Sequence, residues 1–208
     1  MRRISALLIF AVSCASPSGT EGADRAAAAS AAVTRFRDET AKTGEAIGKA
    51  MAGLDELSRA ISGDARTALD AFARSVAELD TQATAMSGAA DSMRTATSAY
   101  MTAWENESKS LVNPDLRLRA LDRRTEVKDA LGKIDAVLKE AQPALLEQRT
   151  QLRDVRTYLS NDLTPRGLAV VKDVQAKARE NGAKVRKLLT PVLEQASRVA
   201  LDIAPARK

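Results

Sequence analysis

Apolar residues recur at alternating spacings of three and four positions over most of this chain. The third quarter is the most regular, since Leu131, Leu138, Leu145, Leu152 and Leu159 return every seven residues. This spacing places one row of apolar side chains along one face of an α-helix. Because a strict seven-residue repeat keeps that row turned toward a neighbouring helix, it predicts a left-handed supercoil.

Three interruptions divide the pattern into four segments. The first is Ser62-Gly63-Asp64. The other two, Asn113-Pro114 and Thr164-Pro165, each place a capping side chain directly before a proline, as is typical of a helix start. We therefore predict four helices, over residues 24–62, 64–112, 114–161 and 165–204.

Each segment contains a row of apolar or small positions that we expect to be buried. In chain order they are Val33, Phe36, Thr40, Thr43, Ile47, Ala50, Leu54, Leu57, Ile61, Leu69, Phe72, Val76, Leu79, Ala83, Met86, Ala90, Met93, Thr97, Tyr100, Trp104, Leu131, Ile134, Leu138, Ala141, Leu145, Gln148, Leu152, Val155, Leu159, Leu168, Val171, Ala178, Val185, Leu189, Val192, Ala196, Val199 and Ile203. Pro143 and Pro191 lie inside the third and fourth segments. Because the leucine repeat continues through Pro143 in phase, we expect kinks rather than helix ends.

The connections between segments are only a few residues long, so consecutive helices have to fold back on each other. The sequence therefore predicts an all-α fold, a long antiparallel up-down-up-down four-helix bundle or coiled-coil rod of left-handed twist. Helices of about 40 to 48 residues would give a rod of roughly 60 to 70 Å. A dimeric or domain-swapped bundle, and hence a homo-oligomer, is left open by the pattern.

The first 13 residues have the pattern of a bacterial export signal. Arg2-Arg3 gives a positive start, and residues 4–12 form an apolar run of nine. That run is shorter than the about 20 residues that a membrane-spanning helix needs, so it fits the core of a signal peptide. The small residues before Cys14 resemble a lipobox, in which the cysteine is lipidated and becomes the new N-terminus.

We therefore expect residues 1–13 to be removed and Cys14 to carry acyl chains that anchor the protein to a membrane. Residues 14–23 would form a flexible tether to a helical bundle over residues 24–204. By resemblance to bacterial lipoproteins, Ala15 favours the periplasmic face of the outer membrane. Two alternatives are secretion without lipid, with cleavage after Ser13 or Ala15, and a cytosolic protein whose apolar start has no targeting role.

The composition argues against catalysis. The chain contains no histidine and a single cysteine, so it lacks the commonest general base and metal ligand and cannot form an internal disulfide. It has no glycine-rich phosphate loop, no Cys-x-x-Cys pair and no serine nucleophile elbow. We therefore expect no enzymatic activity, no cofactor and no metal site.

The charge is distributed unevenly between the two halves of the chain. Residues 21–113 carry 10 Lys/Arg against 14 Asp/Glu, and residues 114–208 carry 20 against 13. One explanation is attraction between the halves within one bundle. Another is a basic surface for anionic lipid headgroups or wall polymers. The candidate contacts for such a surface are Arg123, Arg124, Lys184, Arg186 and Lys187. An exported chain with 3% aromatic residues is not expected to bind nucleic acid.

Three side chains near the end of the second segment have both a structural and a functional interpretation. Tyr100 and Trp104 fall on the core row, so they either pack at one end of the bundle or face the membrane. Glu107 occupies the next position on that row. We expect it to lie in a frayed helix end or to pair with an arginine such as Arg117 or Arg119.

Small and polar residues interrupt the core row at about the middle of the bundle. Thr40, Thr43, Met86, Ala141 and Gly182 are expected to lie at roughly one level. Such a layer predicts a thin waist. It either lets the helices approach closely or provides room for water or a small apolar ligand.

Four stretches of the second and third segments resemble a bacterial family catalogued as domain of unknown function 2959. The stretches are Trp104-Glu105-Asn106-Glu107, Asn113-Pro114-Asp115-Leu116-Arg117, Gln142-Pro143-Ala144-Leu145 and the run from Leu152 to Leu163. The resemblance covers roughly residues 95–203, while the first hairpin matches only in pattern. It implies an exported, lipoprotein-type, all-helical protein and carries over no functional residue.

These observations lead to two functional hypotheses. The first is a non-enzymatic cell-envelope lipoprotein that acts as a helical scaffold or protein-interaction module in the periplasm. Its partners would be the membrane, through lipid on Cys14, and an envelope protein or the cell wall. The second is a helical bundle that binds a lipid or another amphiphile at the waist or in an opening between helices.

Overall fold

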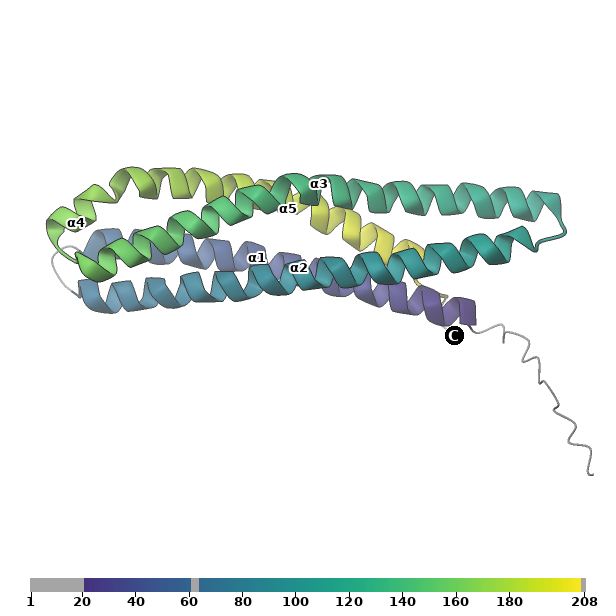
Figure 1. Cartoon of the computed structure of the whole chain (residues 1–208), viewed down its shortest axis with the longest axis horizontal. Helices are drawn as coiled ribbons and strands as arrows, with labels where there is room; N and C mark the ends of the chain where they lie inside the picture. The colour runs from purple at the N-terminus through teal and green to yellow at the C-terminus, as the bar shows by residue number, and fades with distance from the viewer. Residues whose placement is uncertain (1–20, 61–63, 207–208) are drawn as a thin grey trace, which may run out of the picture.

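The computed structural model describes residues 21–60 and 64–206 of the chain, and this part is all-helical. Five helices pack together into one elongated helical bundle (Figure 1). In chain order they are α1 (Glu21–Arg59), α2 (Ala65–Lys109), α3 (Pro114–Asn161), α4 (Pro165–Val170) and α5 (Lys172–Ile203).

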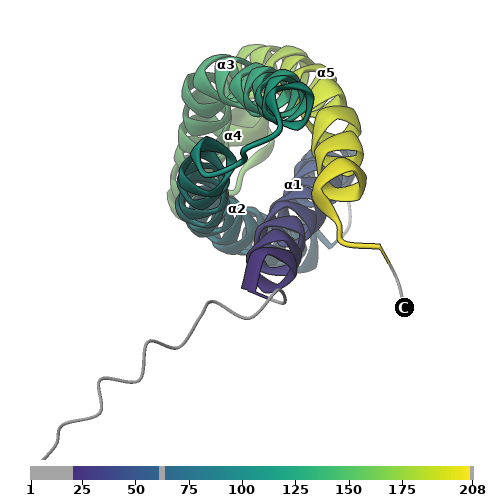
Figure 2. The same ribbon diagram turned by 90° about the vertical axis from the view of Figure 1, so that its right-hand side faces the viewer.

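The four long helices are arranged in a ring. Helix α1 packs against α2 and α5, and α3 packs against the same two helices from the other side (Figure 2). One end of the bundle holds the start of α1, the connection from α2 to α3 and the end of α5 (Figure 1). The short helix α4 lies at the opposite end.

Side-chain caps fix the starts of three helices, two of them at proline as the sequence predicts. The Asp64 carboxylate accepts a hydrogen bond from the Thr67 amide at 3.1 Å before α2. The Asn113 side chain accepts from two amides at the start of α3, and the Thr164 hydroxyl accepts from the Gly167 amide in α4. Each cap satisfies backbone donors that have no partner inside the helix.

The predicted boundaries need three corrections. The helix expected over residues 165–204 is divided at Val171, whose backbone (φ −83°, ψ −2°) separates α4 from α5. Val171 is itself buried, so the apolar repeat continues through the break and conceals it. Helix α2 ends at Lys109 rather than 112, and α1 begins at Glu21 rather than 24.

The core follows the predicted rows closely. Nearly every position expected from the three-four spacing is buried, from Val33 in α1 to Ile203 in α5. Tyr100, Trp104 and Leu131 are only partly buried and pack at the edge of this core. Ile61 lies outside the described residues.

Both internal prolines lie within continuous helices. Helix α3 runs through Pro143, and α5 runs through Pro191. Proline has no amide hydrogen, so one backbone hydrogen bond is lost at each site. The prediction that neither proline ends its helix is confirmed.

Gly182 does not lie at the level of Thr40 and Thr43, as the predicted waist requires. The Thr40 hydroxyl donates to the Phe36 carbonyl at 2.8 Å, and the Thr43 hydroxyl lies within hydrogen-bond distance of the Glu39 and Gln82 carbonyls. Gly182 instead faces Gln148, Met51 and Ile47. Backbone carbonyls accept the hydrogen bonds of the Thr40 and Thr43 hydroxyls. Gly182 leaves space for the side chains of Gln148, Met51 and Ile47 at a different level of the bundle.

Ion pairs join the acidic and basic halves of the chain. Asp80 of α2 accepts from Arg149 and Arg153 of α3, at 2.8 and 2.7 Å. Asp55 of α1 pairs with Arg179 of α5 at 2.6 Å. These pairs join an acidic residue of the first half to a basic residue of the second, as attraction between the halves predicts. The pair between Arg94 of α2 and Asp135 of α3 has the opposite order.

Candidate functional site at the open end of the bundle

We call the end formed by the first turns of α1, residues 98–126 and the end of α5 the open end. Among residues 98–126 no side chain is buried, whereas Thr97 and Val127 on either side of this stretch are. The α2–α3 connection reaches beyond the start of α1 and the end of α5 (Figure 1). At this end α2 therefore lacks its neighbour α1 and α3 lacks its neighbour α5, so one of the two neighbours of each helix is missing and side chains stay exposed.

Two contacts mark where the shorter helices end. Arg25 of α1 pairs with Glu107 of α2. The Arg123 guanidinium of α3 donates to the Asp202 carbonyl near the end of α5 at 3.0 Å. Glu107 was expected to lie in a frayed helix end or to pair with an arginine such as Arg117 or Arg119. It does pair with an arginine, but with Arg25, because the core row of α2 brings Glu107 beside the first turns of α1.

The aromatic pair expected at a bundle end lies here. The Tyr100 and Trp104 rings are 5.5 Å apart and tilted by 38°. With Gly22, Arg25 and Glu107 they line a recess of about 200 Å³. Burial raises the pKa of the Tyr100 hydroxyl above its usual value, so the phenol is neutral at physiological pH.

The basic residues predicted in α3 are engaged in ion pairs at this end. Arg124 pairs with Glu105 of α2 at 2.8 Å, and Arg123 with Glu126 at 3.1 Å. A hydrogen bond from Lys109, together with the charge of Arg124, lowers the pKa of the Glu105 carboxyl. Arg123 and Arg124 thus fasten α3 to its neighbours and are only partly available to an external anion.

The basic residues predicted in α5 lie elsewhere. Lys184, Arg186 and Lys187 are exposed on α5, roughly 25 Å along the helix from Asp202. The Arg186 guanidinium comes within 4.0 Å of where a side chain on Gly48 would begin. The structure therefore does not combine the two predicted basic clusters into one surface.

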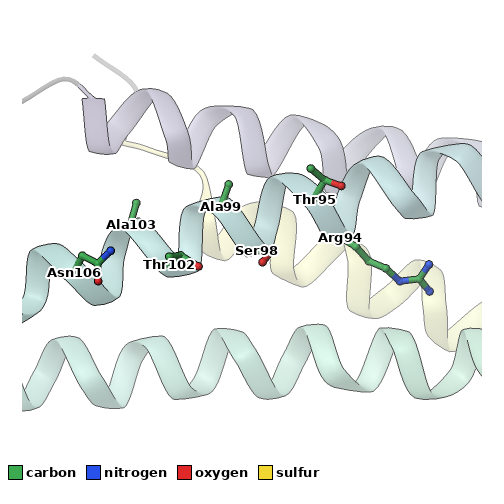
Figure 3. Close-up of a pocket in the computed structure, with 7 residues that line it drawn as sticks. All are labelled: Arg94, Thr95, Ser98, Ala99, Thr102, Ala103 and Asn106. Atoms are coloured by element: carbon green, nitrogen blue, oxygen red, sulfur yellow. The ribbon is translucent and has the colours of Figure 1, made fainter.

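A groove separates α2 from α3 near the open end. It has a volume of about 730 Å³ and is lined by apolar Met101 and Leu131 together with charged residues, among them Arg94, Arg124 and Lys128. An adjoining depression of about 760 Å³ follows the outer face of α2 from Arg94 to Asn106 (Figure 3). Small side chains such as Ser98, Ala99 and Ala103 make that depression shallow.

Four exposed apolar residues at this end, around the α2–α3 connection, were not predicted. Val112 is 92% exposed, and Leu116, Leu118 and Leu121 are 54%, 58% and 47% exposed. Leu118 and Leu121 do not follow the three-four spacing of the core, and this departure was the signal that could have identified them. We call Val112, Leu116, Leu118 and Leu121, together with Arg117 and Arg119, the tip surface.

In the described part of the chain, no group of three or more His, Cys, Asp or Glu side chains is placed to hold a metal ion.

Within the same residues, no helix has an apolar stretch long enough to cross a bilayer.

The predicted lipidation residue, Cys14, lies outside the described residues. In comparisons with known proteins, no family model and no curated protein matched the chain.

Proposed function

We propose that this protein is a non-enzymatic cell-envelope lipoprotein, held by lipid on Cys14 at the periplasmic face of the outer membrane. In this proposal the bundle acts as a helical scaffold or protein-interaction module. The observation that carries the proposal is the short apolar run that ends at a lone cysteine, seven residues before a long helical bundle begins at Glu21. A related proposal is membership of the family catalogued as domain of unknown function 2959, which the run from Leu152 to Leu163 resembles.

We further propose that the bundle is an antiparallel, left-handed four-helix bundle with up-down-up-down connections. The order of the cross-helix contacts supports this arrangement. From α1 to α2, Arg25 pairs with Glu107, and Lys49 pairs with Glu78, so residue numbers rise along one helix as they fall along the other. The seven-residue repeats of α3 and α5 support the left-handed twist.

A scaffold role is supported by where the chain places its apolar groups. Side chains on the three-four rows fill the interior. Of the large apolar residues left exposed, Val112, Leu116, Leu118, Leu121 and Leu201 lie at the open end, and Leu146, Tyr158, Val170 and Val174 lie elsewhere. An elongated bundle of this kind presents long polar faces to partners away from its attachment point. Several copies could also associate through these faces, so a homo-oligomer is compatible with the proposal.

Photo-crosslinking in cells tests the scaffold role. A photoreactive amino acid is placed at exposed positions along the bundle, such as Thr150 of α3 or Thr84 of α2, in the full-length chain. The proposal predicts that one envelope protein or wall polymer is captured repeatedly from one face. Absence of any recurrent partner from all faces, in cells where the protein is abundant, would count decisively against it.

A second candidate is binding of a lipid or another amphiphile. The groove between α2 and α3 favours it, since Met101 and Leu131 offer an apolar floor beside cationic Arg124 and Lys128. Native mass spectrometry of the purified full-length protein distinguishes the two candidates. A stoichiometric ligand that is lost when Leu131 is replaced by Glu would favour this second function, and a ligand-free protein would favour the scaffold.

A further inference from the structure

The tip surface carries apolar side chains that no part of the described chain covers. Four of the largest exposed apolar residues occur within ten positions, from Val112 to Leu121. By helical spacing, Leu116 lies on the same side of α3 as the buried Val127 and Ile134, yet it is 54% exposed. The start of α3 extends beyond α1 and α5 (Figure 1). Leu118 and Leu121 lie on other sides of the same helix, so apolar groups surround the tip rather than extend an internal row.

The backbone of the tip is well fixed. The Asn113 side chain accepts hydrogen bonds from the Asp115 and Leu116 amides, at 2.9 and 3.2 Å. The Arg117 guanidinium donates to the Leu111 carbonyl, which closes the connection between α2 and α3. Val112 therefore lies in a well-ordered turn, but its side chain is not buried by the described part of the chain.

Positive charge surrounds these apolar groups. Between residues 108 and 124 the chain carries five Lys/Arg and two Asp/Glu. No carboxylate of the described residues lies within 4 Å of the Arg117 or Arg119 guanidinium group, whereas Arg123 and Arg124 are paired. Apolar side chains bordered by arginine fit a bilayer surface, where the apolar groups enter the interface and the guanidinium groups reach lipid phosphates.

The tip lies at the end of the bundle from which the predicted anchor leaves. The start of α1 lies beside Trp104 and Glu107, where Gly22 lines the same recess. Six residues separate Cys14 from Glu21, and a chain of that length can span at most about 25 Å. An anchor on Cys14 would therefore hold the open end, rather than the opposite end with α4, toward the membrane.

We propose that the tip surface is a second membrane contact, which inserts Val112 and Leu116 into the interface of a bilayer that contains anionic lipids. This inference rests on the proposed lipid anchor for its orientation, but the contact itself depends only on the tip. With the anchor and the tip both engaged, the bundle stands end-on to the membrane. A second copy of the chain or a protein partner at the tip is an alternative occupant that the test distinguishes.

The test uses the full-length protein extracted from membranes and placed in vesicles. Cys14 is the only cysteine of the chain, so a lipidated Cys14 leaves an engineered cysteine as the sole free thiol. Val112→Cys is labelled with an environment-sensitive fluorophore, and Thr157→Cys, exposed near the other end of α3, is the matched control. Vesicles contain either phosphatidylglycerol with phosphatidylethanolamine or phosphatidylcholine alone.

The tip contact predicts a blue-shifted label at position 112, quenched by lipid-attached quenchers, in the phosphatidylglycerol vesicles only. The label at 157 should stay in water. Arg119→Glu should lower the ratio of inserted to water-exposed label at 112 about tenfold. Lys133→Glu, an exposed charge change further along α3, should leave that ratio unchanged.

The tip proposal is overturned if the label at 112 stays as water-exposed as the label at 157 in both vesicles. It is also overturned if that label becomes buried without vesicles, in proportion to protein concentration, which would indicate a second copy. Flotation with phosphatidylcholine vesicles tests the anchor separately. A protein that fails to float there, takes label on Cys14 and still inserts position 112 into anionic vesicles would refute the anchor and support the tip.

Discussion

Gly167 and Gly132 show how one residue type serves two purposes in this chain. A side chain on Gly167 would begin 2.1 Å from the Asp162 carbonyl oxygen, so the turn into α4 requires glycine. Gly132 lies inside α3 with nothing within 4 Å of that position. Only at Gly167 does the close approach of another residue, Asp162, require glycine.

The same substitution should therefore have opposite effects at the two sites. Gly132→Ala is expected to raise the free energy of unfolding by about 0.5 to 1 kcal/mol, because alanine favours the helix. Gly167→Ala is expected to lower it by about 1 to 3 kcal/mol, because the backbone of the turn has to move. Urea unfolding of both variants measures this, and equal changes of the same sign would contradict the geometry of the turn.

Asp80 is the acidic residue on which the α2–α3 contact depends most. Burial alone would raise the pKa of its carboxyl, but hydrogen bonds from Arg153 and Arg149 outweigh it and the pKa lies below the ordinary value. A carboxyl with a lowered folded pKa stabilises the protein above its unfolded pKa of 3.8. That stabilisation is lost as the pH falls through the folded value.

Asp80→Asn should thus lower the free energy of unfolding at neutral pH by about 1 to 2 kcal/mol. The difference from the natural protein should shrink as the pH falls below about 4, because the natural protein then loses the charge on Asp80, which the variant lacks at every pH. Asp70→Asn, an exposed site on the same helix, is the matched control and should change little at any pH. A difference that persists unchanged into acid would show that the ion pairs contribute nothing.

At the level of single residues the sequence predicted the core well. A three-four spacing specifies which face of a helix is buried, and residues such as Phe36, Leu79 and Leu152 are fully buried as expected. It does not specify where the partner helices stop. Tyr100 and Trp104 continue the row of α2 but stay partly exposed, because α1 begins beside them and no other helix of the described residues covers them.

The helices themselves depend on their first turns, and α3 gives the clearest case. Its start lies on the projecting part of the open end, where no buried side chain assists it. The cap from Asn113 is therefore expected to contribute most of the local order there. Opening of this turn can occur without unfolding the rest of the bundle.

Asn113→Ala should accelerate hydrogen exchange about fivefold at the amides of residues 115–121, since losing a cap costs about 1 kcal/mol. Asn161→Ala, at the other end of α3, is the comparison, because Asn161 donates only to a carbonyl one turn earlier. Exchange measured by mass spectrometry resolves both ends. Equal protection of residues 115–121 in the two variants would contradict the role of the cap.

The element boundaries show what a pattern of apolar positions leaves undetermined. Pro114 and Pro165 begin helices, as the capping signals predict. The break at Val171 was missed because a buried valine fits the repeat whether or not the helix is continuous. Breaks of this kind arise from packing against neighbouring helices, which local spacing does not record.

For the whole molecule, the ring of four long helices provides stability along its length and exposes its aromatic pair and tip surface at one end. The interior is filled by the three-four rows, and the ion pairs between α2 and α3 and between α1 and α5 hold the ring together. The open end collects the aromatic pair, the tip surface and the start of α1. In our account this end faces the membrane, and the long polar faces are left for partners in the periplasm.

The proposed function depends most on the lipid anchor at Cys14, and the intact mass of the full-length protein tests this anchor most directly. The chain is expressed with its own N-terminus in bacteria, extracted from membranes and measured by mass spectrometry. We predict a polypeptide that begins at Cys14, has lost residues 1–13 and carries the additional mass of acyl chains. A polypeptide without acyl mass, whether it begins at Cys14, after Ala15 or at Met1, would contradict the lipid anchor on which the account depends.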